Sequence, residues 1–100
     1  MKWAEVITVR STGGSSKSLT SALRNLMQDM DTKHRREQIR LYQRKGVDSD
    51  FCLVLFHEGE KVGFDGSRIG LRLTAALKDF GMVNHTVWDE FDNHKTFSII

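Results

Sequence analysis

The spacing of hydrophobic positions changes several times along this 100-residue chain, and each change predicts a new element. Residues 3–10 are rich in β-branched side chains, which predicts a strand. A Gly/Ser segment at 11–16 ends that strand and offers serines as helix N-caps. An apolar face at helical spacing follows, made of Leu19, Leu23, Leu26, Met27 and Met30. The chain is therefore predicted to begin with a strand and a helix.

The middle of the chain has the pattern of a β-hairpin. Residues 39–43 predict a short strand, and residues 44–50 have the length and composition of a hairpin loop. Residues 51–57 predict the strongest strand, because all six residues from Phe51 to Phe56 are apolar. A strand that is apolar on both faces is normally buried on both faces. We therefore expect this strand to lie in the centre of the sheet.

A second helix and a last strand are predicted after a polar loop at residues 58–66. Ser67 is a suitable N-cap for the helix, and Gly81 stands where a glycine often ends one. The apolar face of this helix consists of Ile69, Leu73, Ala76, Leu77 and Phe80. Residues 82–91 predict the strand, and the apolar residues 96–100 could add a fifth.

The predicted order is β-α-β-β-α-β, which indicates one α+β domain over residues 1–100. Its natural packing is ferredoxin-like, with an antiparallel sheet in the strand order 4-1-3-2 and two helices on one face. Within this fold the chain resembles the dimeric α+β barrel proteins, whose monomers pair through the sheet face that the helices leave open. This resemblance lies in the order of elements along nearly the whole chain, and it implies a homodimer.

The faces of the two central strands differ in side-chain size. We expect the smaller side chains to pack under the helices, namely Ala4, Val6, Thr8, Cys52, Val54 and Phe56. The open face would then carry Trp3, Glu5, Ile7, Phe51, Leu53, Leu55 and His57. So much exposed apolar surface is unusual on a monomer, so we expect a partner sheet, or a ligand beneath one, to cover it.

Three residues could form a ligand-binding site on that open face. The antiparallel strand order would bring His57 and His85 beside Glu5. Two histidines and a carboxylate are also a ligand set for iron or zinc, but the three come from separate strands without a motif spacing. We therefore predict binding of a small ligand here, with no metal and no cofactor.

Basic residues concentrate in the first half of the chain. Residues 1–50 carry ten Lys/Arg against six Asp/Glu, although the net charge of the whole chain is only +2. The candidate polyanion-binding residues are Lys33, Arg35, Arg36, Arg40 and Arg44. RNA-recognition domains share this element order, but the first strand here lacks their central aromatic residue, so nucleic acid is not an expected partner.

Composition is that of an ordinary globular protein, with 39% hydrophobic and 28% charged residues. No apolar run approaches the ~20 residues of a membrane helix, and the N-terminus lacks the apolar stretch of a signal peptide. The one cysteine, Cys52, cannot form an internal disulfide and reads as a buried apolar residue. We expect a cytoplasmic protein without membrane contact.

These observations favour a homodimer that associates through its sheet face and binds a small ligand or a partner protein. One alternative is a small-molecule enzyme, resembling the oxygenases or isomerases among dimeric α+β barrel proteins. Another is a weak binder of polyanions through the basic residues. The sequence alone leaves open whether the protein is catalytic.

Overall fold

The structure is a computed structural model that describes residues 2–12, 14, 16–33, 39–59 and 65–91. Its elements are β1 (Trp3–Ser11), α1 (Ser16–Lys33), β2 (Ile39–Gln43), β3 (Asp50–His57), α2 (Arg68–Leu77) and β4 (Gly81–Asp89). The predicted α+β fold and the order β-α-β-β-α-β are confirmed. None of the described helices is long and apolar enough to span a bilayer.

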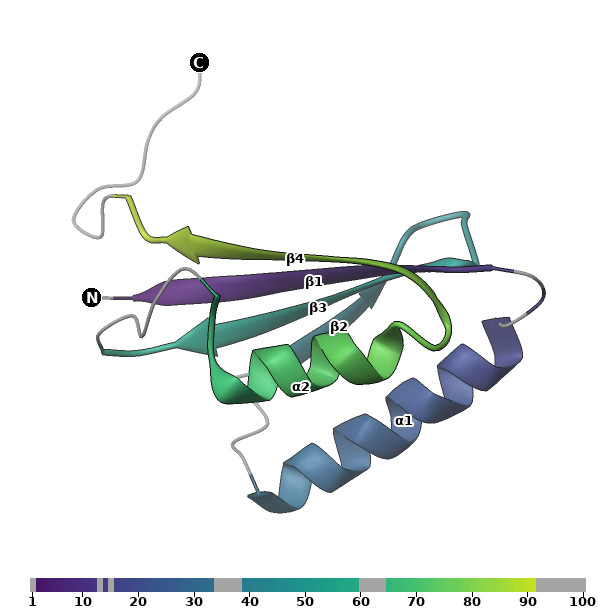
Figure 1. The fold of residues 1–100 in the computed structure, drawn as a ribbon, viewed down its shortest axis with the longest axis horizontal. Helices are drawn as coiled ribbons and strands as arrows, with labels where there is room; N and C mark the ends of the chain where they lie inside the picture. The colour runs from purple at the N-terminus through teal and green to yellow at the C-terminus, as the bar shows by residue number, and fades with distance from the viewer. Residues whose placement is uncertain (1, 13, 15, 34–38, 60–64, 92–100) are drawn as a thin grey trace.

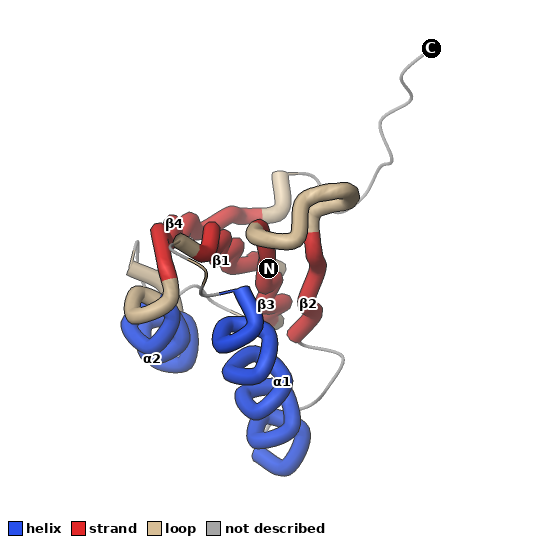
Figure 2. Tube along the Cα trace, turned by 90° about the vertical axis from the view of Figure 1, so that its right-hand side faces the viewer, coloured by secondary structure: helices blue, strands red, loops and turns tan. Residues whose placement is uncertain are grey.

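The four strands form one antiparallel sheet with the order β2-β3-β1-β4, which is the predicted arrangement. Both helices lie on the same side of this sheet, and the other side carries no helix (Figures 1 and 2). Residue pairing fixes which side chains share a face, because directly opposed residues point the same way. Ile7, for example, lies opposite Leu53 on β3 and His85 on β4.

The assignment of side chains to the two faces was wrong, because the large side chains and not the small ones face the helices. The core between sheet and helices includes Ile7, Val9, Phe51, Leu53 and Leu55. Trp3 and Glu5 are buried on the same face. The physical reason is the thickness of the layer: helices stand well above a sheet, so long apolar side chains are needed to fill the space at interior density.

The two helices contribute the other half of the core. Leu19 and Leu23 of α1 and Leu73 and Leu77 of α2 are buried against the sheet. Ser67 caps α2 as predicted, because its hydroxyl accepts a hydrogen bond from the amide of Gly70 at 3.0 Å.

The predicted ends of two elements need correction. Helix α2 stops at Leu77, and Gly81 is the first residue of β4 and not a helix cap. A Cβ at Gly81 would overlap the carbonyl of Arg10, so the close approach of β1 accounts for this glycine. Strand β4 ends at Asp89, and Phe91 lies beyond it, almost fully exposed. The proposed fifth strand at 96–100 lies outside the described residues.

Candidate functional site

The most unusual feature of the molecule is a carboxylate with no solvent contact. Glu5 is the third residue of β1 and lies on the helix-covered face, and its relative exposure is 0%. A buried carboxylate is costly unless hydrogen bonds replace the water it has lost. The N-terminal end of α2 lies close to β1 at this point and supplies part of that replacement.

Four hydrogen bonds reach the two carboxylate oxygens of Glu5, two on each. Oε1 accepts from the backbone amide of Ser67 and from Nε2 of His85, both at 2.9 Å. Oε2 accepts from the Ser67 hydroxyl at 2.5 Å and from Nε2 of His57 at 2.6 Å. The Ser67 hydroxyl also accepts from Gly70, so its own proton points to Glu5. Each oxygen is therefore fully used as an acceptor.

These contacts determine the ionisation of Glu5. Burial by itself raises the pKa of this carboxyl, but the hydrogen bonds from Ser67, His57 and His85 favour the charged form. Together they hold the pKa of Glu5 below its ordinary value of 4.5. Glu5 is thus an anion at neutral pH and has no proton to donate, so both imidazoles must donate theirs.

The register of the sheet explains why the two histidines reach Glu5. His57 lies opposite Trp3 and His85 lies opposite Ile7, so each sits one diagonal step from Glu5 on the same face. The side chain of His57 is 21% exposed and that of His85 is 12% exposed. Since Nε2 of each ring is bonded to Glu5, a ligand would have to use Nδ1, for which the described part of the chain provides no hydrogen-bond partner.

Trp3 completes the site beside His57. Its indole stacks on the His57 ring, with a centroid separation of 4.0 Å and an interplanar angle of 20°. Trp3 is 5% exposed, and among the residues that the structure describes its Nε1–H has no hydrogen-bond partner. Buried donors are usually satisfied, so an unpaired indole N–H needs an explanation.

Two glycines leave the space that the Glu5 carboxylate occupies. Gly70, in the first turn of α2, and Gly66, just before it, both pass so close to Glu5 that a Cβ on either would overlap the carboxylate. Gly66 also has a φ of +93°, a conformation that other residues rarely adopt. The sequence G-S-x-x-G at 66–70 is therefore shaped around the carboxylate.

Glu5, His57 and His85 lie together, which the sequence had left open, but on the other face of the sheet from the one expected. Ser67 was expected only as a helix cap, and its bonds to Glu5 were not predicted. The parts played by Gly66, Gly70 and the indole of Trp3 were not predicted either. The glycines on either side of a helix-capping serine were the available signal, because they indicate close approach of another group.

The arrangement does not have the geometry of a metal centre. The imidazoles bond directly to the carboxylate, so the three groups meet one another and do not surround a common point. No group of three or more His, Cys, Asp or Glu side chains in the described segments could hold a metal ion.

The candidate polyanion-binding residues are only partly described. Arg40 lies exposed on β2, and Arg44, in the hairpin turn, donates to Asp50 at 3.4 Å. Lys33 is the last residue of α1, and its side chain is not described. Arg35 and Arg36 lie outside the described residues.

Comparison with known proteins supports the fold. A variant of SnoaB, a cofactor-independent oxygenase from Streptomyces nogalater, is 10% identical with a TM-score of 0.60, over 95% of this chain and 98% of that chain. Rv0793 from Mycobacterium tuberculosis is 20% identical with a TM-score of 0.61, over 95% and 100%. Both likenesses, which extend over 95% of this chain, support the α+β, ferredoxin-like fold that the sequence predicted. No family model and no curated protein sequence matches it.

Proposed function

We propose that this chain works as a homodimer paired through the open faces of its sheets, and that each protomer binds a small ligand at Glu5, His57 and His85. The observation that carries the ligand-binding part is the buried Glu5 anion, whose four hydrogen bonds leave it no acceptor capacity for anything else. Such a group serves to fix its neighbours. It holds two part-exposed imidazoles in one orientation and one tautomer.

The chemistry of the free groups indicates what the ligand offers. Nδ1 of a neutral imidazole held through Nε2–H is an acceptor, so the ligand presents an O–H or N–H to it. The indole N–H of Trp3, on the ring stacked against His57, is a donor that finds no acceptor among the described residues, so the ligand can supply one. A small enol or phenol with a neighbouring oxygen supplies both.

The ligand proposal can be tested through the two tryptophans. In a ¹H–¹⁵N NMR spectrum the chain gives two indole signals, and Trp88→Phe assigns them. Catechol and acetylacetone, which carry paired oxygens, should move the Trp3 signal and leave the exposed Trp88 signal in place. Trp3→Phe should weaken their binding about tenfold by removing the donor. If neither probe moves the Trp3 signal, or if both indoles move alike, the ligand proposal is wrong.

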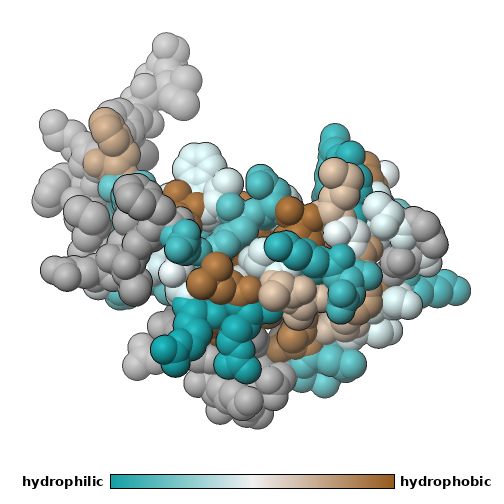
Figure 3. Space-filling view, in the orientation of Figure 1, coloured by the Kyte–Doolittle hydropathy of each residue, from teal (hydrophilic) through white to brown (hydrophobic). Residues whose placement is uncertain are grey.

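The open face of the sheet supports the dimer. Its central side chains are small and half-buried, as at Val6 and Val54. Large apolar side chains stand exposed around them, namely Tyr42, Phe56, Met82 and Trp88. Figure 3 looks at the molecule from the side of α2, in the orientation of Figure 1, and on that side apolar residues form separate small patches. The open face thus combines small, half-buried apolar side chains with exposed aromatic residues, as protein–protein contacts often do.

Two neighbouring residues of β3 provide a matched test of the dimer. Val54 lies on the open face, opposite Arg40 of β2, so Val54→Glu places its charge beside a cation that the protomer already holds. We expect a folded monomer by sedimentation velocity, where the unchanged protein sediments as a dimer. Leu53 is buried in the core, so Leu53→Glu should unfold the protein. A monomeric unchanged protein, or a dimeric Val54→Glu variant, would contradict the proposal.

A catalytic role is the second candidate, and the paired Glu5 and imidazoles favour it. Nδ1 of His57 or His85 could take a proton from a substrate C–H or O–H, while the electron pair stays on the substrate as an enolate or phenolate. Glu5 would stabilise the imidazolium that forms, as a carboxylate does beside a catalytic histidine. Returning the proton to another carbon gives an isomerisation. Combination of the enolate carbon with O₂ forms a C–O bond, and the resulting peroxide takes the proton back from the imidazolium, which gives an oxygenation; SnoaB is described as a cofactor-independent oxygenase.

Proton exchange separates binding from catalysis. If the site is catalytic, 2-tetralone in D₂O should lose its α-protons faster with the protein than without it. His57→Gln and His85→Gln should each reduce that acceleration, and Trp88→Phe should not. Binding of the probes without any acceleration of exchange would favour the ligand-binding role alone.

A further inference from the structure

The open face carries a pocket that is unrelated to the Glu5 site. It has a volume of about 430 Å³ and lies where β1 ends, β3 begins and the β2–β3 hairpin turns. Such a volume falls within the usual range for small-molecule sites. The Glu5 side chain points to the helix-covered face, so the sheet itself separates the two places.

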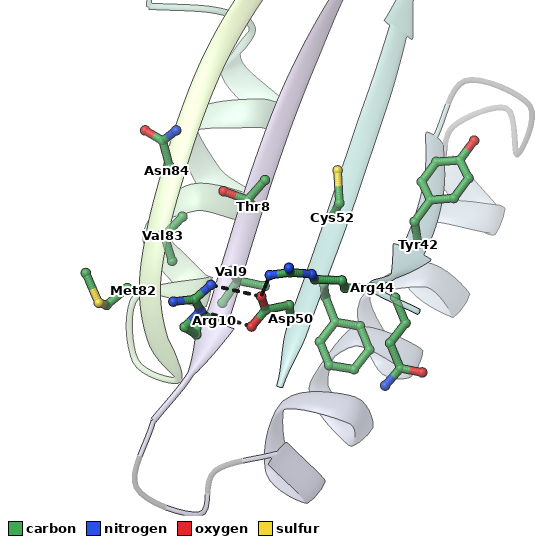
Figure 4. A pocket seen from close by; sticks show the side chains of 12 residues that line it. Thr8, Val9, Arg10, Tyr42, Arg44, Asp50, Cys52, Met82, Val83 and Asn84 are labelled. Atoms are coloured by element: carbon green, nitrogen blue, oxygen red, sulfur yellow. Dashed lines mark hydrogen bonds and ion pairs between the residues drawn. The ribbon is translucent and has the colours of Figure 1, made fainter. Parts of the chain in front are cut away.

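The walls of this pocket are of three kinds (Figure 4). The Cys52 thiol and the thioether of Met82 are apolar, and the aromatic ring of Tyr42 stands at the β2 side. Thr8 and Asn84 bring a hydroxyl and an amide from β1 and β4. A flat, mainly apolar ligand with one polar group would match such walls.

The charges at one end give the sign of that polar group. Arg10 donates two hydrogen bonds to Asp50, Nε to Oδ1 and Nη2 to Oδ2, each of 3.1 Å. Arg44 adds a third from Nη1 to Oδ2 at 3.4 Å. Among the described lining residues two guanidinium groups thus face one carboxylate, which leaves one positive charge in excess. Both Arg side chains are more than half exposed, so their unused N–H donors can reach a ligand.

We propose that this pocket binds a small aromatic carboxylate, with the ring beside Cys52 and Tyr42 and the carboxylate at Arg10 and Arg44. The probe is 2-naphthoate, with 2-naphthylmethanol as its uncharged counterpart. Binding is read from the backbone amides of Thr8, Cys52 and Asn84 in ¹H–¹⁵N spectra. Because this face is also the proposed dimer contact, titrations at several protein concentrations separate ligand binding from association.

Three results are expected. 2-Naphthoate should shift the pocket amides and leave the Trp3 indole signal unchanged. Arg44→Gln should weaken 2-naphthoate about fivefold, as suits a partly exposed charged contact, and should leave 2-naphthylmethanol unaffected. Asp50→Asn should strengthen 2-naphthoate binding, because it removes the competing carboxylate. If Asp50→Asn does not fold, the Arg44→Gln comparison decides by itself.

The proposal fails if 2-naphthoate leaves the pocket amides unmoved, or if Arg44→Gln weakens both probes equally. It also fails if the Trp3 indole moves together with the pocket amides, since the ligand would then be reporting the Glu5 site. A second readout uses Cys52, the one cysteine of the chain. Burial raises the pKa of its thiol, so alkylation by neutral iodoacetamide should be slow, and bound 2-naphthoate should slow it further.

Discussion

Replacing Glu5 with Gln tests the role of the buried carboxylate while keeping its shape. One carboxylate oxygen becomes an NH₂ group, which then faces two donors where an acceptor is needed. Two charge-assisted hydrogen bonds are lost and the other two become weaker. Hydrogen bonds to charged groups contribute about 1.5–3 kcal/mol each, and removing the desolvation cost of the anion offsets part of the loss. We expect a net loss of about 3 kcal/mol in the free energy of unfolding.

Thermal and urea unfolding, followed by circular dichroism, measure this loss. For a domain of this size each 1 kcal/mol moves the Tm by about 4–8 °C, so the expected loss should lower the Tm of Glu5→Gln by roughly 12–24 °C. The matched control is Glu58→Gln, because Glu58 is exposed and 3.9 Å from Lys2, and an exposed pair of this kind contributes little. A Glu5→Gln variant with the same Tm as the Glu58→Gln control would refute the reasoning.

The same pair of proteins should differ in their response to acid. The pKa of Glu5 in the folded protein is lowered, so its ionisation stabilises the fold fully above the ordinary value of 4.5. That contribution is lost as the pH falls from about 5 through the lower, folded-state pKa. Arg10 holds the pKa of Asp50 low as well, which acts in the same direction in both proteins. The stability difference between the two should therefore be constant above about pH 5 and shrink below it.

Two further substitutions probe the surroundings of Glu5, and one salt titration probes the basic residues. Gly70→Ala should destabilise the protein by about 1–3 kcal/mol in urea unfolding, because its Cβ would overlap the Glu5 carboxylate. Alanine is otherwise the better helix former, so a stabilised variant would contradict this prediction. Ser67→Ala removes both the cap of α2 and a donor to Glu5, so a loss of about 2 kcal/mol is expected, against no measurable change for exposed Ser18→Ala. Any polyanion binding through the basic residues should be weak, and its affinity should fall with roughly one power of salt concentration per phosphate contact. The residues concerned are Lys33, Arg35, Arg36, Arg40 and Arg44. Tight DNA binding that survives about 200 mM salt, measured by fluorescence anisotropy, would overturn this prediction.

The strands were predictable because their local patterns are strong. The six-residue apolar run from Phe51 to Phe56 could only be a central strand. The β-branched residues of β1 and the short hairpin before β3 were equally clear. The end of α2 was less so, because Gly81 suits a helix cap and a close strand contact equally well.

Which face of the sheet packs against the helices can be predicted only from the patterns of all four strands together. On β1 and β3 both faces carry apolar residues, so these strands alone do not decide. The edge strands decide which face is polar. Arg40 and Asn84 fall on the face shared with Val54 and Thr8. Ile39 and Val83 fall on the opposite face, which they share with Leu55 and Val9. Summed over the sheet, the polar set lies opposite the helices. Glu5 concealed this pattern, because a charged residue in a strand normally indicates the solvent side.

The hydrogen-bond assignment at Glu5 is the central claim, and histidine ¹⁵N NMR tests it most directly. Two-bond ¹H–¹⁵N correlations distinguish the two neutral tautomers of each ring, and His57→Gln and His85→Gln assign the signals. At mildly alkaline pH both rings should be protonated on Nε2 and bare on Nδ1, and catechol should perturb the Nδ1 signals. A neutral ring with its proton on Nδ1 and none on Nε2 could not donate to Glu5 as the hydrogen-bond geometry requires, and finding one for either histidine would contradict the account.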